Sequence, residues 1–318
     1  MKTLVAKTAA GALLACASVG LVNAQDYPTK PIRFIVPGPG GVDAIARPFL
    51  PHLAEALGQT TVIENLPGGP RPGMLVAKAE PDGHTLFLTG RGHWLAPLTL
   101  KDAPYDSLKD FAAIGIVYDQ PYLLLVNSKL PVKSVKELIA LAKSRPGQLN
   151  MGAGAPAGTG TLGGALFRQM AGVDIKAIPY KTGSDRSAGL LAGQIEVDFL
   201  SSSETAQLGK TDRVRLIAVS SGKPSPQYPG TLPIGEAVPG YDFGSNGILF
   251  APAKTPARII TRVNQELNKL LKRPDIQKVL LASGSDPVGG SVEEATRFVA
   301  NDYQAMQKVL AAEGVKPQ

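Results

Sequence analysis

Two glycine-rich segments are the parts of this sequence best suited to hold a ligand. The first runs from Pro37 to Asp43 and follows the apolar run Ile32 to Val36. The second, from Gly152 to Gly164, also follows a strand-like run and precedes a helix-like one. Glycine lets backbone amides approach a ligand closely, and the first turn of a helix leaves several N–H groups unpaired. Each segment therefore predicts a site for an anion.

The second segment contains a literal G-x-G-x-x-G, from Gly158 to Gly163. Such a motif after a strand can bind a dinucleotide, make a tight turn, or hold an anion at the start of a helix. The next strand runs through Ile178 to Lys181 without the acidic residue that would hold a ribose, so we favour the anion.

Other polar side chains follow the ends of predicted strands, where loops carry function disproportionately. On this ground we add three candidate ligand-binding residues: His93, Tyr180 and Ser202. The competing interpretations are packing for His93, and helix capping for Ser202 and for the segment Tyr180 to Ser184. Trp94, next to His93, is expected near the same rim. The cations whose charge could assist are Arg47, Arg91 and Lys181.

Several kinds of catalysis are excluded by the residues available. The three histidines, His52, His84 and His93, include no i,i+4 pair for a zinc-protease helix, and no G-x-S-x-G occurs. Gly209-Lys210-Thr211 resembles the end of a phosphate-binding loop, but Glu204 stands where the leading glycine belongs. We predict no catalytic residue, no cofactor and no metal site.

The first 24 residues have the pattern of an export signal. Lys2 and Lys7 precede the apolar stretch Ala9 to Val22, and Val22-Asn23-Ala24 forms a cleavage site. A periplasmic protein is expected; the alternative is a lipoprotein anchored through Cys16. Cleavage after Ala24 would leave no cysteine and lower the formal charge from +7 to +5. The basic residues are scattered rather than clustered, so nucleic-acid binding is not predicted.

Strand-like and helix-like segments alternate along the rest of the chain, which predicts an α/β fold of parallel-type sheets with helices on both faces. The predicted strands are Ile32 to Val36, Thr61 to Glu64, Thr85 to Thr89, Ile114 to Val117, Tyr122 to Asn127, a run from Leu149, Ile175 to Pro179, Val197 to Leu200, Val214 to Ser220 and Gly247 to Phe250. Helices are predicted from Ser134, Thr255 and Ser291, each from its capping residues and apolar stripe.

The sequence has no polar linker that would separate two independent domains. Two glycine-rich strand ends without a linker favour two lobes joined by paired crossings of the chain, near Tyr122 to Asn127 and near Phe243 to Phe250. We expect residues 25–124 and 250–318 to form lobe 1, and residues 125–249 to form lobe 2.

The ordered set of short motifs resembles the solute-binding proteins of tripartite tricarboxylate transporters, the Bug family. The matching stretches are Tyr27 to Ile32, Val36 to Asp43, Glu64 to Gly69, Pro81 to Leu86, Pro179 to Lys181, Gly193 to Ile195 and Pro239 to Tyr241. No single motif is specific, but together they span nearly the whole chain in order.

The resemblance implies a two-lobed, type II-like periplasmic binding protein fold. Such a protein, expected to be a monomer, closes on a small carboxylate or other anionic solute and delivers it to membrane permease subunits. In that family the ligand carboxylate is held largely by backbone groups and ordered waters between the two glycine-rich loops. The resemblance therefore implies a set of ligand-binding residues in each loop: Pro39, Gly40, Gly41 and Asp43 in the first, and Gly158, Thr159, Gly160 and Thr161 in the second. His93, Tyr180 and Ser202 lie at matching strand ends. This chain departs from the family in three respects: the span from Pro37 to Asp43 is two residues short, Pro48 and Pro51 are expected to interrupt the next helix, and Thr161 stands where histidine is common.

Two other functions remain compatible with these residues. A ligand-loaded receptor for a membrane sensor would share every feature above. An exported α/β enzyme would need titratable groups in the cleft, and Asp43, His93 and Lys181 are the only scattered candidates.

Overall fold

The computed structural model describes residues 27–317 except 39–40, 68, 156–157 and 210. The predicted signal segment 1–24, with Cys16, and the candidate residues Pro39 and Gly40 lie outside the described residues.

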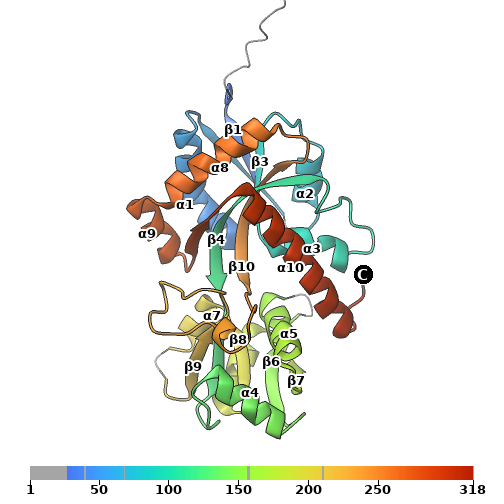
Figure 1. The fold of residues 1–318 in the computed structure, drawn as a ribbon, viewed down its shortest axis with the longest axis vertical. Helices are drawn as coiled ribbons and strands as arrows, with labels where there is room; N and C mark the ends of the chain where they lie inside the picture. Colours follow the sequence, from blue (N-terminus) through green and yellow to red (C-terminus); the bar gives the residue numbers. More distant parts are fainter. Residues whose placement is uncertain (1–26, 39–40, 68, 156–157, 210, 318) are drawn as a thin grey trace, which may run out of the picture.

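The strands form two sheets, one above the other along the long axis of the molecule (Figure 1). The first sheet has the order β11-β4-β10-β3-β1-β2, and the second has the order β7-β6-β8-β5-β9. The strands are β1 (Ile32–Pro37), β2 (Thr61–Leu66), β3 (Thr85–Thr89), β4 (Phe111–Pro121), β5 (Leu123–Asn127), β6 (Leu149–Ala153), β7 (Ile175–Pro179), β8 (Val197–Leu200), β9 (Val214–Val219), β10 (Gly244–Pro252) and β11 (Asp286–Gly289).

Helices cover both faces of each sheet, as an α/β fold requires. We call the first sheet with α1–α3 and α8–α10 the first lobe, and the second sheet with α4–α7 the second lobe. The helices are α1 (Gly41–Ala56), α2 (Arg71–Ala77), α3 (Arg91–Thr99), α4 (Val135–Ser144), α5 (Thr159–Ala171), α6 (Gly183–Ala192), α7 (Ser202–Gln207), the short η1 (Ile234–Glu236), α8 (Ala257–Leu271), α9 (Pro274–Ala282) and α10 (Val292–Ala312). The lobe boundaries 124/125 and 249/250 stay a prediction, and all of β10 pairs within the first sheet.

Both sheets are mixed rather than purely parallel. Strand β1 is parallel to β2 and β3, and β6 is parallel to β7 and β8, whereas β10 and β5 run antiparallel to their neighbours. The reversal follows from the crossings, because β5 enters the second lobe from the first and β10 returns the other way. The parallel strands of each lobe therefore direct their carboxyl ends, where α/β sheets bind ligands, toward the other lobe.

The two crossings of the chain are fastened to each other through Ser220. Its N–H donates to the carbonyl of Tyr122 at 2.9 Å, and its Oγ accepts from the Tyr122 N–H at 2.7 Å. On the other side the Phe243 N–H donates to the Ser220 carbonyl at 2.9 Å, and the Ser220 hydroxyl donates to the Phe243 carbonyl. One serine thus joins the start of β5 to the segment just before β10.

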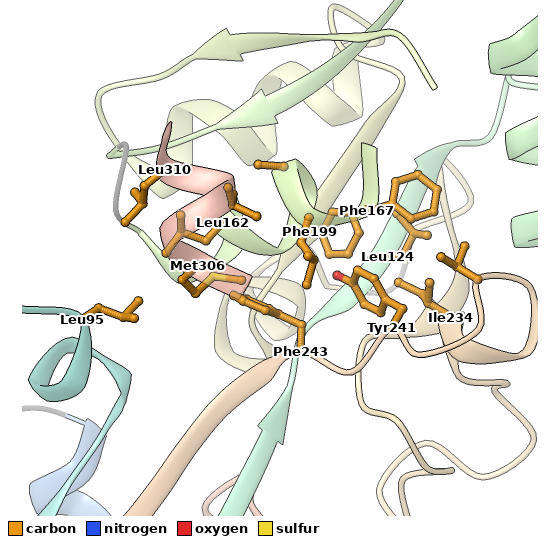
Figure 2. Close-up of a cluster of buried hydrophobic side chains, with 14 of the residues drawn as sticks. Leu95, Leu124, Leu162, Phe167, Phe199, Ile234, Tyr241, Phe243, Met306 and Leu310 are labelled. Atoms are coloured by element: carbon orange, nitrogen blue, oxygen red, sulfur yellow. The ribbon is translucent and has the colours of Figure 1, made fainter. Parts of the chain in front are cut away.

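A third connection between the lobes is made by α10, which begins on the first sheet and reaches α5 of the second lobe (Figure 1). Met306 and Leu310 of α10 belong to one buried cluster with Leu95 of α3, Leu162 of α5 and Phe243 (Figure 2). The lobes therefore share a hydrophobic core on the side where α10 lies.

Helix α1 continues through both of its prolines, contrary to the expected interruption. Each proline removes one backbone donor from the helix. The helix nevertheless buries a continuous apolar face formed by Ile45, Ala46, Phe49, Leu50, Leu53 and Ala54. We attribute the continuity to this burial, which outweighs the missing hydrogen bonds.

Candidate functional site

The first glycine-rich segment is fastened to the neighbouring strand by Asp43. This carboxylate lies buried in the first turn of α1, where Oδ1 accepts from Asn65 Nδ2 at 2.6 Å and Oδ2 accepts from Arg47 Nε at 3.0 Å. Arg47 Nη2 closes the triangle by donating to Asn65 Oδ1 at 2.6 Å. Asp43 therefore holds the start of α1 against the end of β2, rather than standing free as an acid.

Gly38 and Gly41 lie on either side of residues 39–40 of this loop. A Cβ on Gly38 would lie 2.8 Å from Asn65 Nδ2, so a larger residue would displace the amide that Asp43 holds. Gly41 begins α1 and is exposed, and a Cβ added to it would meet no atom of the described residues within 4 Å. Its N–H belongs to the first turn of a helix, which can donate to an anion.

His93 lines a cavity of about 400 Å³ at the carboxyl ends of β1 and β3, which we call the first-lobe cavity. Its ring packs edge-on against Phe87 and Phe111, and Nδ1 lies 3.0 Å from the Tyr105 hydroxyl. Burial lowers the pKa of His93 to about 3, because the charged form would lose its hydration. Nε2 is buried without a partner among the described residues. His93 is thus a neutral aromatic residue with one unused ring nitrogen.

Trp94 and Arg91 lie behind this cavity, in the core. Trp94 is fully buried and donates from Nε1 to Asp302 Oδ2 at 2.7 Å, so its expected place at the rim is wrong. The Arg91 guanidinium binds Asp302, the Gly244 carbonyl and Asn246 Oδ1, and it stacks on the Phe243 ring. With four of its five N–H groups engaged and its side chain buried, Arg91 is a structural cation rather than a ligand-binding one.

The second glycine-rich segment turns directly into α5. Gly158 is the N-cap residue, and Thr161 Oγ1 accepts from the Gly154 N–H at 2.8 Å, which holds the two ends of the loop together. A Cβ on Gly160 would lie 2.7 Å from the Phe199 carbonyl oxygen, so this glycine lets α5 pack closely on β8. The glycine spacing therefore has a packing cause in addition to the predicted anion site. Thr159 and Gly160 are the first residues of α5.

Thr161, Gly154 and Ala155 line a second cavity, of about 690 Å³, which we call the side cavity. Its wall also includes Thr99 at the end of α3, a residue that lines the first-lobe cavity too. The two cavities therefore share Thr99 as a wall residue. This brings the loops that follow β1, β3 and β6 to one region.

Tyr180 and Ser202 lie elsewhere on the second lobe. The Tyr180 ring packs toward α6, where a Cβ on Gly189 would clash with its hydroxyl at 2.3 Å. Ser202 faces the turn before β11, and its Oγ is buried without a partner among the described residues. Neither residue lines the first-lobe or the side cavity. Lys181 is exposed beside Tyr180.

The sequence did not reveal a buried charge network beneath the second loop. Arg186 of α6 lies 3.0 Å from Asp198 Oδ2 through Nε and 2.7 Å from Glu204 Oε1 through Nη2. Its Nη1 lies 3.2 Å from the Cβ position of Gly154, so the guanidinium supports the loop from below. Burial raises the pKa of Asp198, and the Arg186 charge opposes that rise. No local spacing joins these residues, since they come from three separate elements.

The described residues contain no group of three or more His, Cys, Asp or Glu side chains placed to hold a metal ion. None of the helices in the described part of the chain is long and apolar enough to cross a membrane. The arrangement offers backbone N–H groups, hydroxyls and one neutral imidazole, which bind and orient a solute.

Comparison with known proteins gives consistent matches over most of the chain. A family model described as the tripartite tricarboxylate transporter family receptor matches residues 45–315. Protein BugT of Bordetella pertussis is 29% identical over 96% of both chains.

Two solved structures are similar along their whole length. R. palustris Rpa4515 with adipate is 32% identical, covers 92% of this chain and 100% of its own, and has a TM-score of 0.67. A TctC solute-binding protein from Polaromonas, solved without ligand, is 22% identical, covers 90% of this chain and 99% of its own, and has a TM-score of 0.79; it shows a common fold.

Proposed function

Because this chain belongs to the tripartite tricarboxylate transporter receptor family, we propose that it captures a small carboxylate-bearing solute between its lobes and delivers it to the permease subunits of such a transporter. The chain would act in the periplasm, as a monomer and without chemistry on the solute. The adipate in the Rpa4515 structure, a protein 32% identical to this one, supports a carboxylate as the ligand.

The observation that carries the proposal is that two loop-to-helix turns, one in each lobe, lie at cavities that share a wall residue. The first-lobe turn, held by Asp43, and the second-lobe turn, held by Thr161 and Gly154, lie at cavities that share Thr99. Each turn begins a helix of more than ten residues, whose first N–H groups and dipole favour a carboxylate. A ligand that touches both turns would favour the closed arrangement of the lobes.

The hinge for such closure would be the pair of crossings at Tyr122 and Phe243. Ser220 joins both crossings, so they would bend together. The buried contact of α10 with α5 would limit the direction of closure, since Leu310 and Leu162 share one core.

Native mass spectrometry of gently purified protein, followed by isothermal calorimetry against carboxylic acids, tests the proposal. We expect at least one carboxylate to bind, and Asp43→Ala to weaken that binding about tenfold by releasing Asn65 and Arg47 from the loop. Asp275→Ala is the matched control, because Asp275 forms an exposed ion pair with Arg273 at the start of α9 and lines neither cavity. If no carboxylate or other anion binds the folded protein, the proposed function is wrong.

A further inference from the structure

The side cavity extends away from the second-lobe turn to the segment that follows α10. One part of its wall is the loop with Gly154 and Thr161, and another part is the segment Glu313 to Lys316. Its volume of about 690 Å³ is within the range of small-molecule sites and exceeds what one carboxylate group needs. The space beyond the turn is therefore large enough for the rest of a ligand.

The segment after α10 is held in place at this wall. Gly314 adopts a left-handed conformation with φ of 68°, and the Val315 N–H donates to the Leu310 carbonyl at 2.9 Å, which closes the helix end. Glu313 Oε1 accepts from Arg168 Nη2 of α5 at 2.6 Å. The segment is thereby attached to α5, the helix whose first turn forms the second-lobe rim.

The lining of the side cavity is mostly apolar and includes two charged side chains. The apolar residues are small, and they are Ala153, Ala155, Ala165, Ala177, Pro179 and Val315. Two charged side chains line it, Glu313 and Lys316. Glu313 is paired with Arg168, whereas Lys316 has no hydrogen bond or ion pair with the described residues. The cavity thus matches an apolar chain that ends in an anionic group.

We infer that the side cavity receives the far end of the solute and that Lys316 selects solutes whose far end is a second carboxylate on an apolar chain. The inference rests on the proposed function for the near end, which the two loop-to-helix turns would hold. Small side chains leave room for methylene groups, and the exposed ammonium of Lys316 attracts the second carboxylate without losing its own hydration.

The test compares straight-chain dicarboxylates, succinate to suberate, with the monocarboxylates of equal length by isothermal calorimetry. We expect Lys316→Ala to weaken adipate binding about threefold and Lys316→Glu about tenfold, with hexanoate affinity changed less than about twofold. The difference in adipate affinity between the wild type and the Lys316 variants should shrink at high salt. Lys308→Glu is the matched control, since Lys308 is exposed on α10 and makes the same charge change away from the cavity.

A second variant tests the cavity by volume rather than by charge. Ala177→Leu, on β7, should fill the space and weaken adipate and suberate more than succinate. Equal binding of wild type and both Lys316 variants, or preference of the wild type for monocarboxylates, overturns the inference and leaves the proposed function standing. Failure of the wild type to bind any carboxylate overturns both.

Discussion

Arg91 of α3 and Asp302 of α10 form a two-pronged ion pair inside the first lobe. Nε donates to Oδ2 at 2.9 Å and Nη2 to Oδ1 at 3.0 Å, and the two side chains are only 4% and 8% exposed. Trp94 adds a third hydrogen bond to the same carboxylate. Because the Arg91 guanidinium also binds the Gly244 carbonyl at the start of β10, this pair connects α3, α10 and one crossing between the lobes.

Asp302→Ala should therefore lower the free energy of unfolding by about 3–5 kcal/mol, because it leaves the buried Arg91 charge without its partner. Urea unfolding followed by Trp94 fluorescence measures the loss. The double variant Arg91→Met with Asp302→Leu should lose less, since no isolated charge remains. Asp275→Ala, which removes an exposed carboxylate, should leave the urea midpoint unchanged. A double variant as unstable as Asp302→Ala would contradict this account.

His93 should make the protein sensitive to acid. Its folded-state pKa of about 3 is below the ordinary value, so only the unfolded chain takes up the proton as the pH falls below about 6.5. The free energy of unfolding is therefore higher at pH 7.5 and falls as the pH is lowered toward 3. At pH 5 the neutral His93 should have cost the protein about 2 kcal/mol of this free energy relative to pH 7.5. His93→Phe should remove this loss, as urea titrations at pH 7.5 and pH 5 would show.

Tyr105→Phe separates burial from hydrogen bonding as the cause. Burial alone lowers the pKa of His93, so removing the Tyr105 hydroxyl should leave the acid sensitivity in place. The loss of acid sensitivity in Tyr105→Phe would assign the effect to the hydrogen bond instead.

Asp119, near the end of β4, should have the opposite pH dependence. It lines a cavity of about 590 Å³ with Asp242 and Asp286, and burial together with these two carboxylates raises its pKa to about 7, although Arg91 opposes the rise. The folded state binds the proton of the Asp119 carboxyl more tightly than the unfolded chain does. The stabilisation that this proton provides is complete below about pH 4 and is lost as the pH rises through 7.

Asp119→Asn should consequently stabilise the protein more at pH 8 than at pH 5, with a difference of about 2–3 kcal/mol in the free energy of unfolding. The asparagine oxygen can still accept from Asn246 Nδ2, which lies 3.0 Å from Asp119 Oδ1. Asp242→Asn should give a smaller effect of the same sign, because it removes one repelling charge. If Asp119→Asn raises the free energy of unfolding equally at pH 5 and pH 8, the Asp119 carboxylate is ionised at both pH values and the prediction is wrong.

Much of the fold follows from local sequence. Strands β3, β7 and β8 have the limits that their apolar runs predict, because glycine, proline or polar residues bound each run. Strand β11 was not predicted, since Asp286 to Gly289 contains one large apolar residue and gains its place by pairing with β4. The mixed strand directions also depend on the crossings, which no local pattern encodes.

The candidate site was predictable only where the backbone itself forms it. The two loop-to-helix turns were visible as glycines between a strand and a helix. Side-chain contacts were not, because partners lie far apart in sequence: Asp302, which takes the Trp94 indole N–H, is 208 residues away. Arg186 and Asp198 likewise come together only through tertiary packing, and so do Lys316 and Gly154, which line one cavity.

Gly160→Ala tests whether the exact position of the second-lobe turn matters for binding. A Cβ at this position would lie 2.7 Å from the Phe199 carbonyl oxygen and 3.1 Å from the Tyr122 ring, so the first turn of α5 must shift. We expect carboxylate affinity to fall about tenfold, because displaced amide donors lose their alignment. Gly164→Ala is the control on the same helix: its Cβ would meet the Met151 sulfur at 2.6 Å, and that flexible side chain can move. Both substitutions make the same chemical change in α5, so a difference between them in calorimetric affinity reports the position of the turn. Equal affinities for the two variants would mean that the ligand does not depend on the N–H groups at the start of α5.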